Sequence, residues 1–114
     1  MKLDLTQFLC CGRYYLELTC GACPEQYDVY NESGRKVAYL RLRHGYFRCD
    51  VPDVFGTTIY DSNPEGNGAF TDEERPIELQ NAVDSIDKFY DTHNIDEVWA
   101  EYTKLNEKPN ERPT

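Results

Sequence analysis

Residues 35–51 read RKVAYLRLRHGYFRCDV, and this stretch decides the fold. His44 and Gly45 have the character of a two-residue hairpin turn, because glycine tolerates the positive φ that such turns require. Pairing two strands around this turn puts apolar side chains on one face, with Leu42 opposite Phe47, Leu40 opposite Cys49 and Ala38 opposite Val51. The other face pairs Arg43 with Tyr46, Arg41 with Arg48 and Tyr39 with Asp50. A slip of one residue would mix the two faces, so the sequence predicts the register as well as the hairpin.

Strand-like segments flank this hairpin on both sides. They are residues 13–20, residues 26–30 and residues 57–61. The alternation in the first of them predicts that Cys20 shares the apolar face with Leu18. Residues 31–34 have turn composition and join the second strand to the hairpin. The sequence therefore predicts an antiparallel meander with one apolar face.

The C-terminal part of the chain is predicted to be helical. Pro76 suits the first turn of a helix whose apolar residues recur at helical spacing: Leu79, Ala82, Val83, Ile86, Phe89 and Tyr90. Asn94 and Glu97 have the spacing of a cap and its N3 residue. They precede a second helix with the apolar stripe Ile95, Val98, Trp99, Tyr102 and Leu105. A further short helix is predicted over residues 5–11.

These elements give a fold of the α+β class. We predict an antiparallel meander sheet of four to five strands covered on one face by two C-terminal helices, because each layer has apolar surface that needs a partner. A chain of 114 residues accommodates one domain, which we assign to residues 1–106. Residues 107–114 are predicted to form a disordered tail, since they lack apolar side chains.

Charge is distributed unevenly along the chain, whose net charge is −9. Residues 35–49 contain five cations and no acid, whereas residues 72–114 contain twelve acids and five cations. The sequence thus predicts a positive sheet face and a negative helical side. The overall negative charge disfavours general binding to nucleic acid or to an anionic membrane.

The chain begins MKLDLTQFLCC, which lacks the features of a signal peptide, and it contains no apolar stretch long enough for a transmembrane helix. A cytoplasmic location is the expectation. The five cysteines are then most simply reduced thiols.

A zinc-stabilised adaptor is an alternative suggested by Cys20 and Cys23, which form a C-x-x-C pair at a strand end. Further ligands would come from Cys10, Cys11, Cys49 or His44. The adjacent cysteines at positions 10 and 11 are awkward ligands for a single metal. We therefore predict structural thiols, with Cys49 facing the core, and neither a metal nor another cofactor.

Residues 61–68 predict a loop, and Asp61, Asn63, Glu65 and Gly66 match the first half of an EF-hand calcium loop. The match then fails, because Asp72 stands where a bidentate glutamate is expected. A strand rather than a helix also precedes this loop. A turn-rich loop without calcium is the simpler interpretation.

Catalytic motifs are not evident in the sequence. Its two histidines, His44 and His93, lie in a predicted turn and near a predicted helix end, outside any recognisable nucleophile or acid–base motif. The expectation is that the protein is not an enzyme.

Two candidate partner-binding surfaces follow from the charge pattern. The sheet face offers Tyr39, Arg41, Arg43, Tyr46 and Arg48, which suit carboxylate or phosphate groups. The helices offer Asp84, Asp87, Asp91, Glu97 and Glu101. Either set is also compatible with an ordinary solvated face, in which the arginines pair with Asp50, Glu17 or Asp28.

The predicted function is a non-catalytic acidic interaction module that binds another macromolecule through charged surfaces. In general character such a small acidic chain resembles inhibitors encoded by phages and mobile elements, such as nucleic-acid mimics and CRISPR-nuclease inhibitors. The expected partner is a protein, such as a nucleic-acid-processing enzyme, and the chain is expected to be a monomer or a weak homodimer. A nucleotide- or nucleic-acid-binding role for the Arg/Tyr face is the other alternative.

Overall fold

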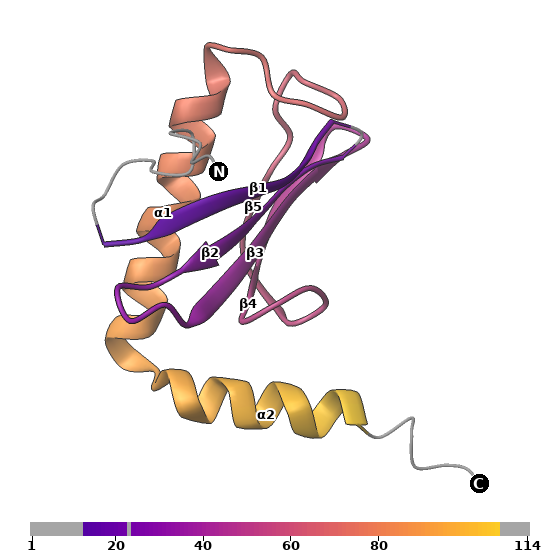
Figure 1. The fold of residues 1–114 in the computed structure, drawn as a ribbon. Helices are drawn as coiled ribbons and strands as arrows, with labels where there is room; N and C mark the ends of the chain where they lie inside the picture. Colours follow the sequence, from indigo (N-terminus) through magenta and orange to yellow (C-terminus); the bar gives the residue numbers. More distant parts are fainter. Residues whose placement is uncertain (1–12, 23, 108–114) are drawn as a thin grey trace, which may run out of the picture.

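The computed structural model describes residues 13–22 and 24–107 (Figure 1). Five strands form one antiparallel sheet in chain order: β1 (Tyr15–Gly21), β2 (Glu25–Tyr30), β3 (Lys36–Arg43), β4 (Tyr46–Val51) and β5 (Thr57–Ser62). Two helices follow, α1 (Glu74–Thr92) and α2 (Ile95–Glu107). The predicted α+β meander is confirmed, with five strands packed against two C-terminal helices. The short helix predicted over residues 5–11 lies outside the described residues, and so do residues 108–114 of the predicted tail.

The β3–β4 hairpin forms in the predicted register. The five pairs that join these strands are Tyr39–Asp50, Leu40–Cys49, Arg41–Arg48, Leu42–Phe47 and Arg43–Tyr46. His44 and Gly45 have φ of 53° and 75°, as a two-residue type I′ turn requires. Leu40, Leu42 and Phe47 are 0% exposed, so this face of the hairpin is the centre of the core.

Helix α1 covers the apolar face of the sheet (Figure 1). It buries Leu79, Ala82, Val83 and Ile86, four of the six apolar positions predicted for it. Phe47 meets Phe70 and Tyr60 edge to face, with ring centroids 4.9 and 6.0 Å apart. Burying each large side chain in this layer stabilises the fold by roughly 1.5–3 kcal/mol.

Helix α2 lies across the end of the sheet (Figure 1). Trp99 Nε1 donates to the Lys36 carbonyl at 2.8 Å, and the Tyr102 hydroxyl donates to the Val54 carbonyl at 2.8 Å. The predicted cap is confirmed, because Asn94 Oδ1 accepts from the backbone amides at positions 96 and 97 at 2.9 and 3.2 Å. Among the described side chains of this helix, Ile95 is the one that packs against the core cluster, so most of the α2 stripe lies outside the core under α1.

Helix α1 begins with a capping box that joins it to the preceding loop. Thr71 Oγ1 accepts from the Glu74 amide at 3.2 Å, and the Glu74 carboxylate accepts from the Thr71 amide at 2.9 Å. The same carboxylate accepts from the amides of Glu65 and Gly66, both at 2.8 Å. Desolvation opposes ionisation of Glu74, but these hydrogen bonds outweigh it and lower its pKa. The Thr-x-x-Glu spacing is a sequence signal for this box, and it agrees with the helix start predicted from Pro76 and the acidic residues before it.

Strand β1 confirms the prediction for residues 13–20, but the side predicted for Cys20 is wrong. The register of β1 with β2 shifts between Leu18 and Cys20, so Cys20 pairs with Gln26. Gln26 pairs in turn with Arg41, which places Cys20 in an outer-face row. A bulge adds one residue to a strand and reverses the alternation beyond it, and the residue pattern of β1 carries no sign of this.

An ion pair between a buried carboxylate and a half-buried arginine joins the sheet to the start of α1. Glu25 is 2% exposed and faces the helix layer, beside Leu42. Arg75 Nε donates to Glu25 Oε2 at 2.8 Å, and Arg75 Nη2 donates to Glu25 Oε1 at 3.1 Å. The Phe70 amide donates to Oε1 at 2.9 Å, and the Tyr27 hydroxyl donates to Oε2. Burial raises the pKa of Glu25, but the hydrogen bonds from Arg75, Tyr27 and Phe70 outweigh burial and lower it.

Replacing Arg75 with Met should lower the free energy of unfolding at neutral pH by about 3–5 kcal/mol, because it leaves the Glu25 carboxylate buried without its cation. Urea unfolding measures this loss. Because the folded pKa of Glu25 is lowered, its contribution is complete above the unfolded value of about 4.3 and is lost as pH falls through the folded value. Wild type should therefore lose stability below about pH 4.3 more steeply than Glu25→Gln. Parallel stability–pH curves for the two proteins would contradict this account.

Gly66 should tolerate no side chain. A Cβ at this position would lie 1.9 Å from the Ala69 carbonyl oxygen, which is backbone and cannot rotate away. We expect Gly66→Ala to destabilise the fold by roughly 1–3 kcal/mol, as overpacking does. Gly21→Ala is the matched control, since nothing lies within 4 Å of a Cβ there. Equal midpoints of thermal unfolding for both variants would show that the loop around Gly66 adjusts freely.

Candidate functional site

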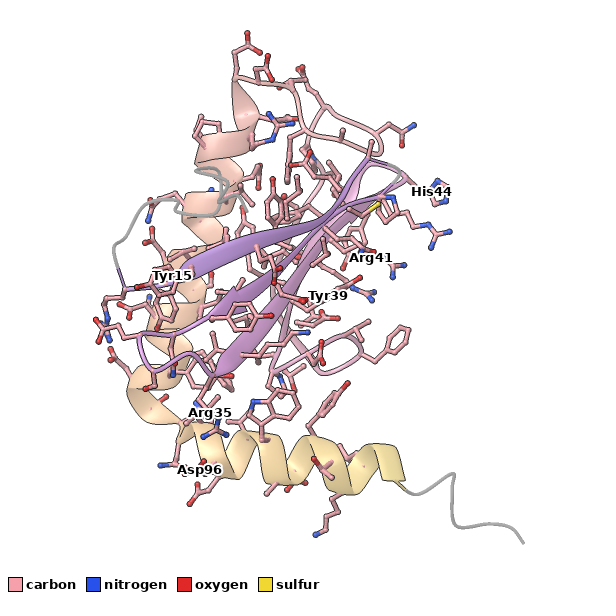
Figure 2. All side chains as sticks on the ribbon, in the orientation of Figure 1. Tyr15, Arg35, Tyr39, Arg41, His44 and Asp96 are labelled. Atoms are coloured by element: carbon pink, nitrogen blue, oxygen red, sulfur yellow. The ribbon has the colours of Figure 1, made fainter. Side chains whose placement is uncertain are left out.

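The outer face of the sheet carries a hollow of about 270 Å³ near the β3–β4 turn. We call it the arginine hollow, and its lining is Arg41, Arg43, His44, Tyr46 and Arg48. Figure 2 shows Arg41 and His44 projecting from the side of the sheet that faces away from α1. Four of the five predicted sheet-face residues therefore meet at one place.

The fifth predicted sheet-face residue, Tyr39, is only 8% exposed and does not line the hollow. Its hydroxyl donates to Gln26 Oε1 at 2.9 Å, and Lys36 Nζ lies 5.9 Å from the centre of its ring. Lys36 also forms ion pairs with Asp28 and Asp53 at 2.9 and 2.7 Å. This half of the outer face is therefore occupied by contacts that stabilise the sheet.

The charges of the arginine hollow are only partly compensated. Arg48 Nε lies 3.2 Å from Asp50 Oδ2, an ionic contact without hydrogen-bond geometry. Asp50 is 1% exposed and also accepts from Thr58 Oγ1 at 2.7 Å and from the Phe55 amide at 3.2 Å. Within residues 13–22 and 24–107, Arg41 and Arg43 form no ion pair. Pairing of an outer-face arginine with Asp50 is thus confirmed for Arg48 alone.

The predicted acidic residues are divided between the two helices. Asp87 on α1 forms an ion pair with Arg13 at 3.0 Å and accepts from the Tyr14 hydroxyl at 3.2 Å. Burial, together with the charge of Asp87, raises the pKa of Tyr14 to about 12. Asp84 accepts from Gln80 Nε2 at 2.9 Å. Asp91 is exposed on the same helix, whereas Glu97 and Glu101 belong to α2.

A second hollow, of about 610 Å³, lies between α2, the end of α1 and the β4–β5 connection. We call it the α2 groove. Its apolar lining includes Val51, Phe55, Phe89, Val98, Tyr102 and Leu105, and Glu97 and Glu101 also border it. Sequence reasoning missed this groove, because it treated the α2 stripe as cover for the sheet.

Phe55 is the most exposed aromatic residue of the α2 groove, at 73%. Its backbone has φ of 68°, a left-handed conformation that is costly for a bulky side chain. The turn is held by the Asp50 carboxylate, which accepts from the Phe55 amide, and by the Gly56 amide, which donates to the Asp53 carbonyl at 2.9 Å. The fold thus holds an exposed phenyl ring on a strained backbone, a combination typical of functional loops.

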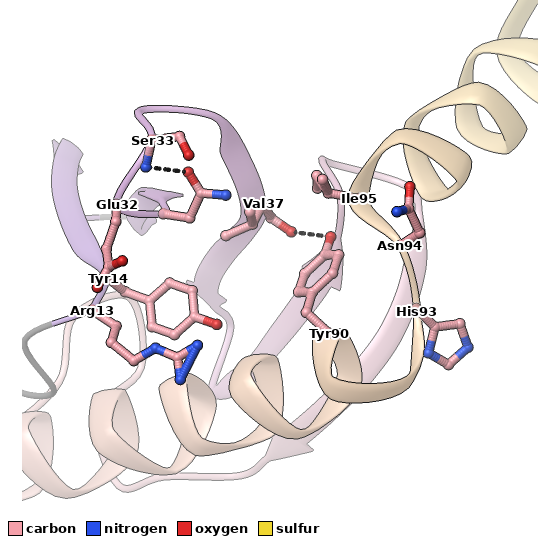
Figure 3. A pocket seen from close by; sticks show the side chains of 10 residues that line it. Arg13, Tyr14, Glu32, Ser33, Val37, Tyr90, His93, Asn94 and Ile95 are labelled. Atoms are coloured by element: carbon pink, nitrogen blue, oxygen red, sulfur yellow. Dashed lines mark hydrogen bonds between the residues drawn. The ribbon is translucent and has the colours of Figure 1, made fainter.

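A third hollow, of about 320 Å³, lies between the β2–β3 turn and the end of α1 (Figure 3). Several of its polar groups are engaged within the fold. Tyr90 donates to the Val37 carbonyl at 2.7 Å, Arg13 and Tyr14 bind Asp87, and His93 Nδ1 lies 2.9 Å from the Phe89 carbonyl. These contacts leave few of its polar groups for a ligand.

Cys49 cannot share a metal ion with Cys20. Cys49 is 0% exposed in the core, while Cys20 lies in an outer-face row. Strands β2 and β3 separate their strands, which places them about 14 Å apart. Among the residues that the structure describes, no three His, Cys, Asp or Glu side chains cluster as a metal site would require. Cys10, Cys11 and Cys23 lie outside this set.

The polar groups of the loop over residues 61–68, which was compared with a calcium site, form hydrogen bonds within the protein. Asp61 accepts from the Tyr46 hydroxyl at 2.8 Å, and the amides of Glu65 and Gly66 donate to Glu74. Residues 67 and 68 accept backbone hydrogen bonds from Gly45 and Glu25 at 2.7 and 2.9 Å. The loop therefore joins the β3–β4 turn and β2 to the start of α1.

Comparison of the chain with protein-family models, with curated proteins and with solved structures finds no match in any of the three. Neither helix of the described residues has the apolar length that crossing a bilayer requires. The arginine hollow and the α2 groove are therefore the candidate sites for function.

The two described thiols should differ in reactivity. Burial, followed by the charge of Asp50, raises the pKa of Cys49, and this thiol is out of reach of solvent. We expect iodoacetamide at pH 8 to alkylate Cys20 in the native protein and to modify Cys49 only after unfolding in guanidinium. Peptide mass mapping measures both sites. Equal native rates at the two thiols would mean that Cys49 is accessible.

Proposed function

We propose that this chain is a non-catalytic, acidic interaction module that binds a protein partner in the α2 groove. One observation carries the proposal: an apolar groove of about 610 Å³ is bordered by Glu97 and Glu101. Phe55 and Leu105 are 73% and 62% exposed beside it. We also propose that the protein is cytoplasmic, as expected from the sequence.

Exposed apolar residues gathered in one groove favour a protein partner. Single exposed apolar side chains are common on protein surfaces, whereas contiguous ones bordered by polar residues are typical of interaction sites. Val98, Tyr102 and Leu105 recur along one side of α2 and face Phe55 across the groove. Aromatic residues in such positions supply much of the binding free energy of protein interfaces.

The charge of the groove indicates the chemistry of that partner. Glu97 and Glu101 are exposed and one helical turn apart, and the net charge of the chain is −9. A complementary segment presents leucine or phenylalanine to the groove and lysine or arginine to the two glutamates. An amphipathic basic helix has this arrangement. Nucleic acid does not fit, because the apolar lining and the acidic border offer nothing to a phosphate backbone.

Basic amphipathic surfaces are common on proteins that handle nucleic acid. Occupation of such a surface by this acidic module would block it. We therefore extend the proposal to an inhibitor of a nucleic-acid-processing enzyme, of the type that phages and mobile elements encode. Support for this extension comes from the acidity of the chain and of the groove border.

Affinity capture with matched variants tests the proposal. Leu105→Asp places a charge in the groove, and Ile77→Asp is its control, since Ile77 on α1 is 61% exposed and Leu105 is 62% exposed. Leu105→Asp should reduce capture of the partner at least tenfold, which corresponds to about 1.4 kcal/mol, while Ile77→Asp should leave it unchanged.

Charge reversal provides an independent arm of the same experiment. Glu97→Lys with Glu101→Lys should abolish capture of proteins bound by the wild type, and Asp84→Lys with Asp91→Lys should not. All four carboxylates are exposed on helices, so the two double variants change the net charge equally. Capture that survives the groove variants, or that both sets abolish alike, would overturn the proposal.

A further inference from the structure

We infer that the arginine hollow binds a phosphate monoester, at a site separate from the α2 groove. The hollow lies at the β3–β4 turn, whereas the groove lies at the α2 end of the sheet. The two share no lining residue, and they adjoin where Arg48 Cζ lies 5.9 Å from the centre of the Phe55 ring. This inference therefore goes beyond the proposed function and can fail without it.

The sheet holds the arginines in a fixed arrangement. Arg41 on β3 and Arg48 on β4 are direct cross-strand partners, and Arg43 lies two residues further along the same face. Beneath them the inner-face residues Leu40 and Leu42 are 0% exposed, so the backbone that carries the arginines is anchored in the core. Because the strands hold the backbone of the three arginines in place, a ligand does not have to order a loop to reach their side chains.

Like charges directly opposite each other destabilise a strand pair. Arg41 and Arg48 are in that position, and no carboxylate of the described residues forms an ion pair with Arg41 or Arg43. The chain has 21 acidic and 12 basic residues, yet the fold brings none of the described acids to these two arginines. An external anion would relieve the repulsion, so the arrangement favours a ligand of opposite charge.

The carboxylates nearest in the sheet are already engaged. Asp61 pairs with Arg48 across the β4–β5 ladder, but its Oδ2 accepts from the Tyr46 hydroxyl at 2.8 Å. Asp50 is buried beneath Thr58 and the Phe55 amide. These two acids reduce the positive charge around Arg48 and leave Arg41 and Arg43 as the principal anion ligands.

Arginine side chains suit phosphate because their planar forks donate two parallel hydrogen bonds to it. The hollow of about 270 Å³ has room for a single phosphate group, and Tyr46, 39% exposed, adds an aromatic edge. A long polyanion is disfavoured by the net charge of −9. The ligand is therefore a small dianion, and a phosphorylated side chain and a nucleoside monophosphate are its two sources.

Titration with inorganic phosphate, O-phosphoserine and adenosine monophosphate tests the inference, with thermal unfolding and ¹H–¹⁵N amide shifts as readouts. Wild type should gain thermal stability, and amide shifts should concentrate at the β3–β4 turn. Arg41→Gln with Arg43→Gln should weaken the response at least tenfold. The same variant should melt no lower than wild type without ligand, because it loses a like-charge contact.

Lys88→Gln with Lys104→Gln is the matched control. Both lysines are exposed on the helices, so this variant changes the net charge equally away from the hollow. It should respond as wild type does, and so should Leu105→Asp. Arg43→Gln alone is the fallback if the double variant fails to fold, since Arg43 is exposed at the end of β3.

The three ligands separate the sources. Equal responses to the three ligands would show that the site recognises the phosphate group alone. A stronger response to O-phosphoserine or to adenosine monophosphate would identify the molecule that supplies the phosphate. All titrations use sodium chloride at matched ionic strength as a blank. Absence of a response, or an equal loss in the arginine and lysine variants, would overturn the inference.

Discussion

The pairing of β3 with β4 is the constraint on which the rest of the structure depends. Because side chains alternate with a period of two, a shift of one residue would turn Arg41 and Arg48 toward α1. Burying a guanidinium group without a partner in that layer would destabilise the fold by several kcal/mol, so the shifted register is strongly disfavoured. The same register that completes the core also collects the outer arginines, and a single sequence pattern accounts for both surfaces of the hairpin.

Elements whose residues alternate or recur over a long segment could be predicted from the sequence. The hairpin, α1 and the Asn94 cap follow from local chemistry that no distant contact overrides. The bulge after Leu18 could not be predicted, because one extra residue leaves the strand equally β-like. The burial of Glu25 was missed for a different reason, since its partner Arg75 is fifty positions away and no spacing rule joins them.

The candidate sites divide in the same way. Arg41, Arg43, Tyr46 and Arg48 meet as predicted, because the hairpin register alone brings them together. The α2 groove could not be predicted, because an apolar stripe identifies the side of a helix that is apolar but not the segment that packs against it. Tyr102 illustrates the difference: its hydroxyl reaches the Val54 carbonyl of a loop, and only tertiary structure brings that loop to the helix.

The attachment of α2 has a consequence for how the molecule fluctuates. Ile95, the hydrogen bonds of Trp99 and Tyr102 and the Arg35–Asp96 ion pair at 2.8 Å join this helix to a sheet whose own core lies under α1. A helix held by so few groups can open as a separate cooperative unit, at a lower free energy than the whole fold. A partner bound between α2 and Phe55 would then suppress that opening. Its binding would be detected as slower amide hydrogen exchange in the last two turns of the helix rather than as a change in the shape of the molecule.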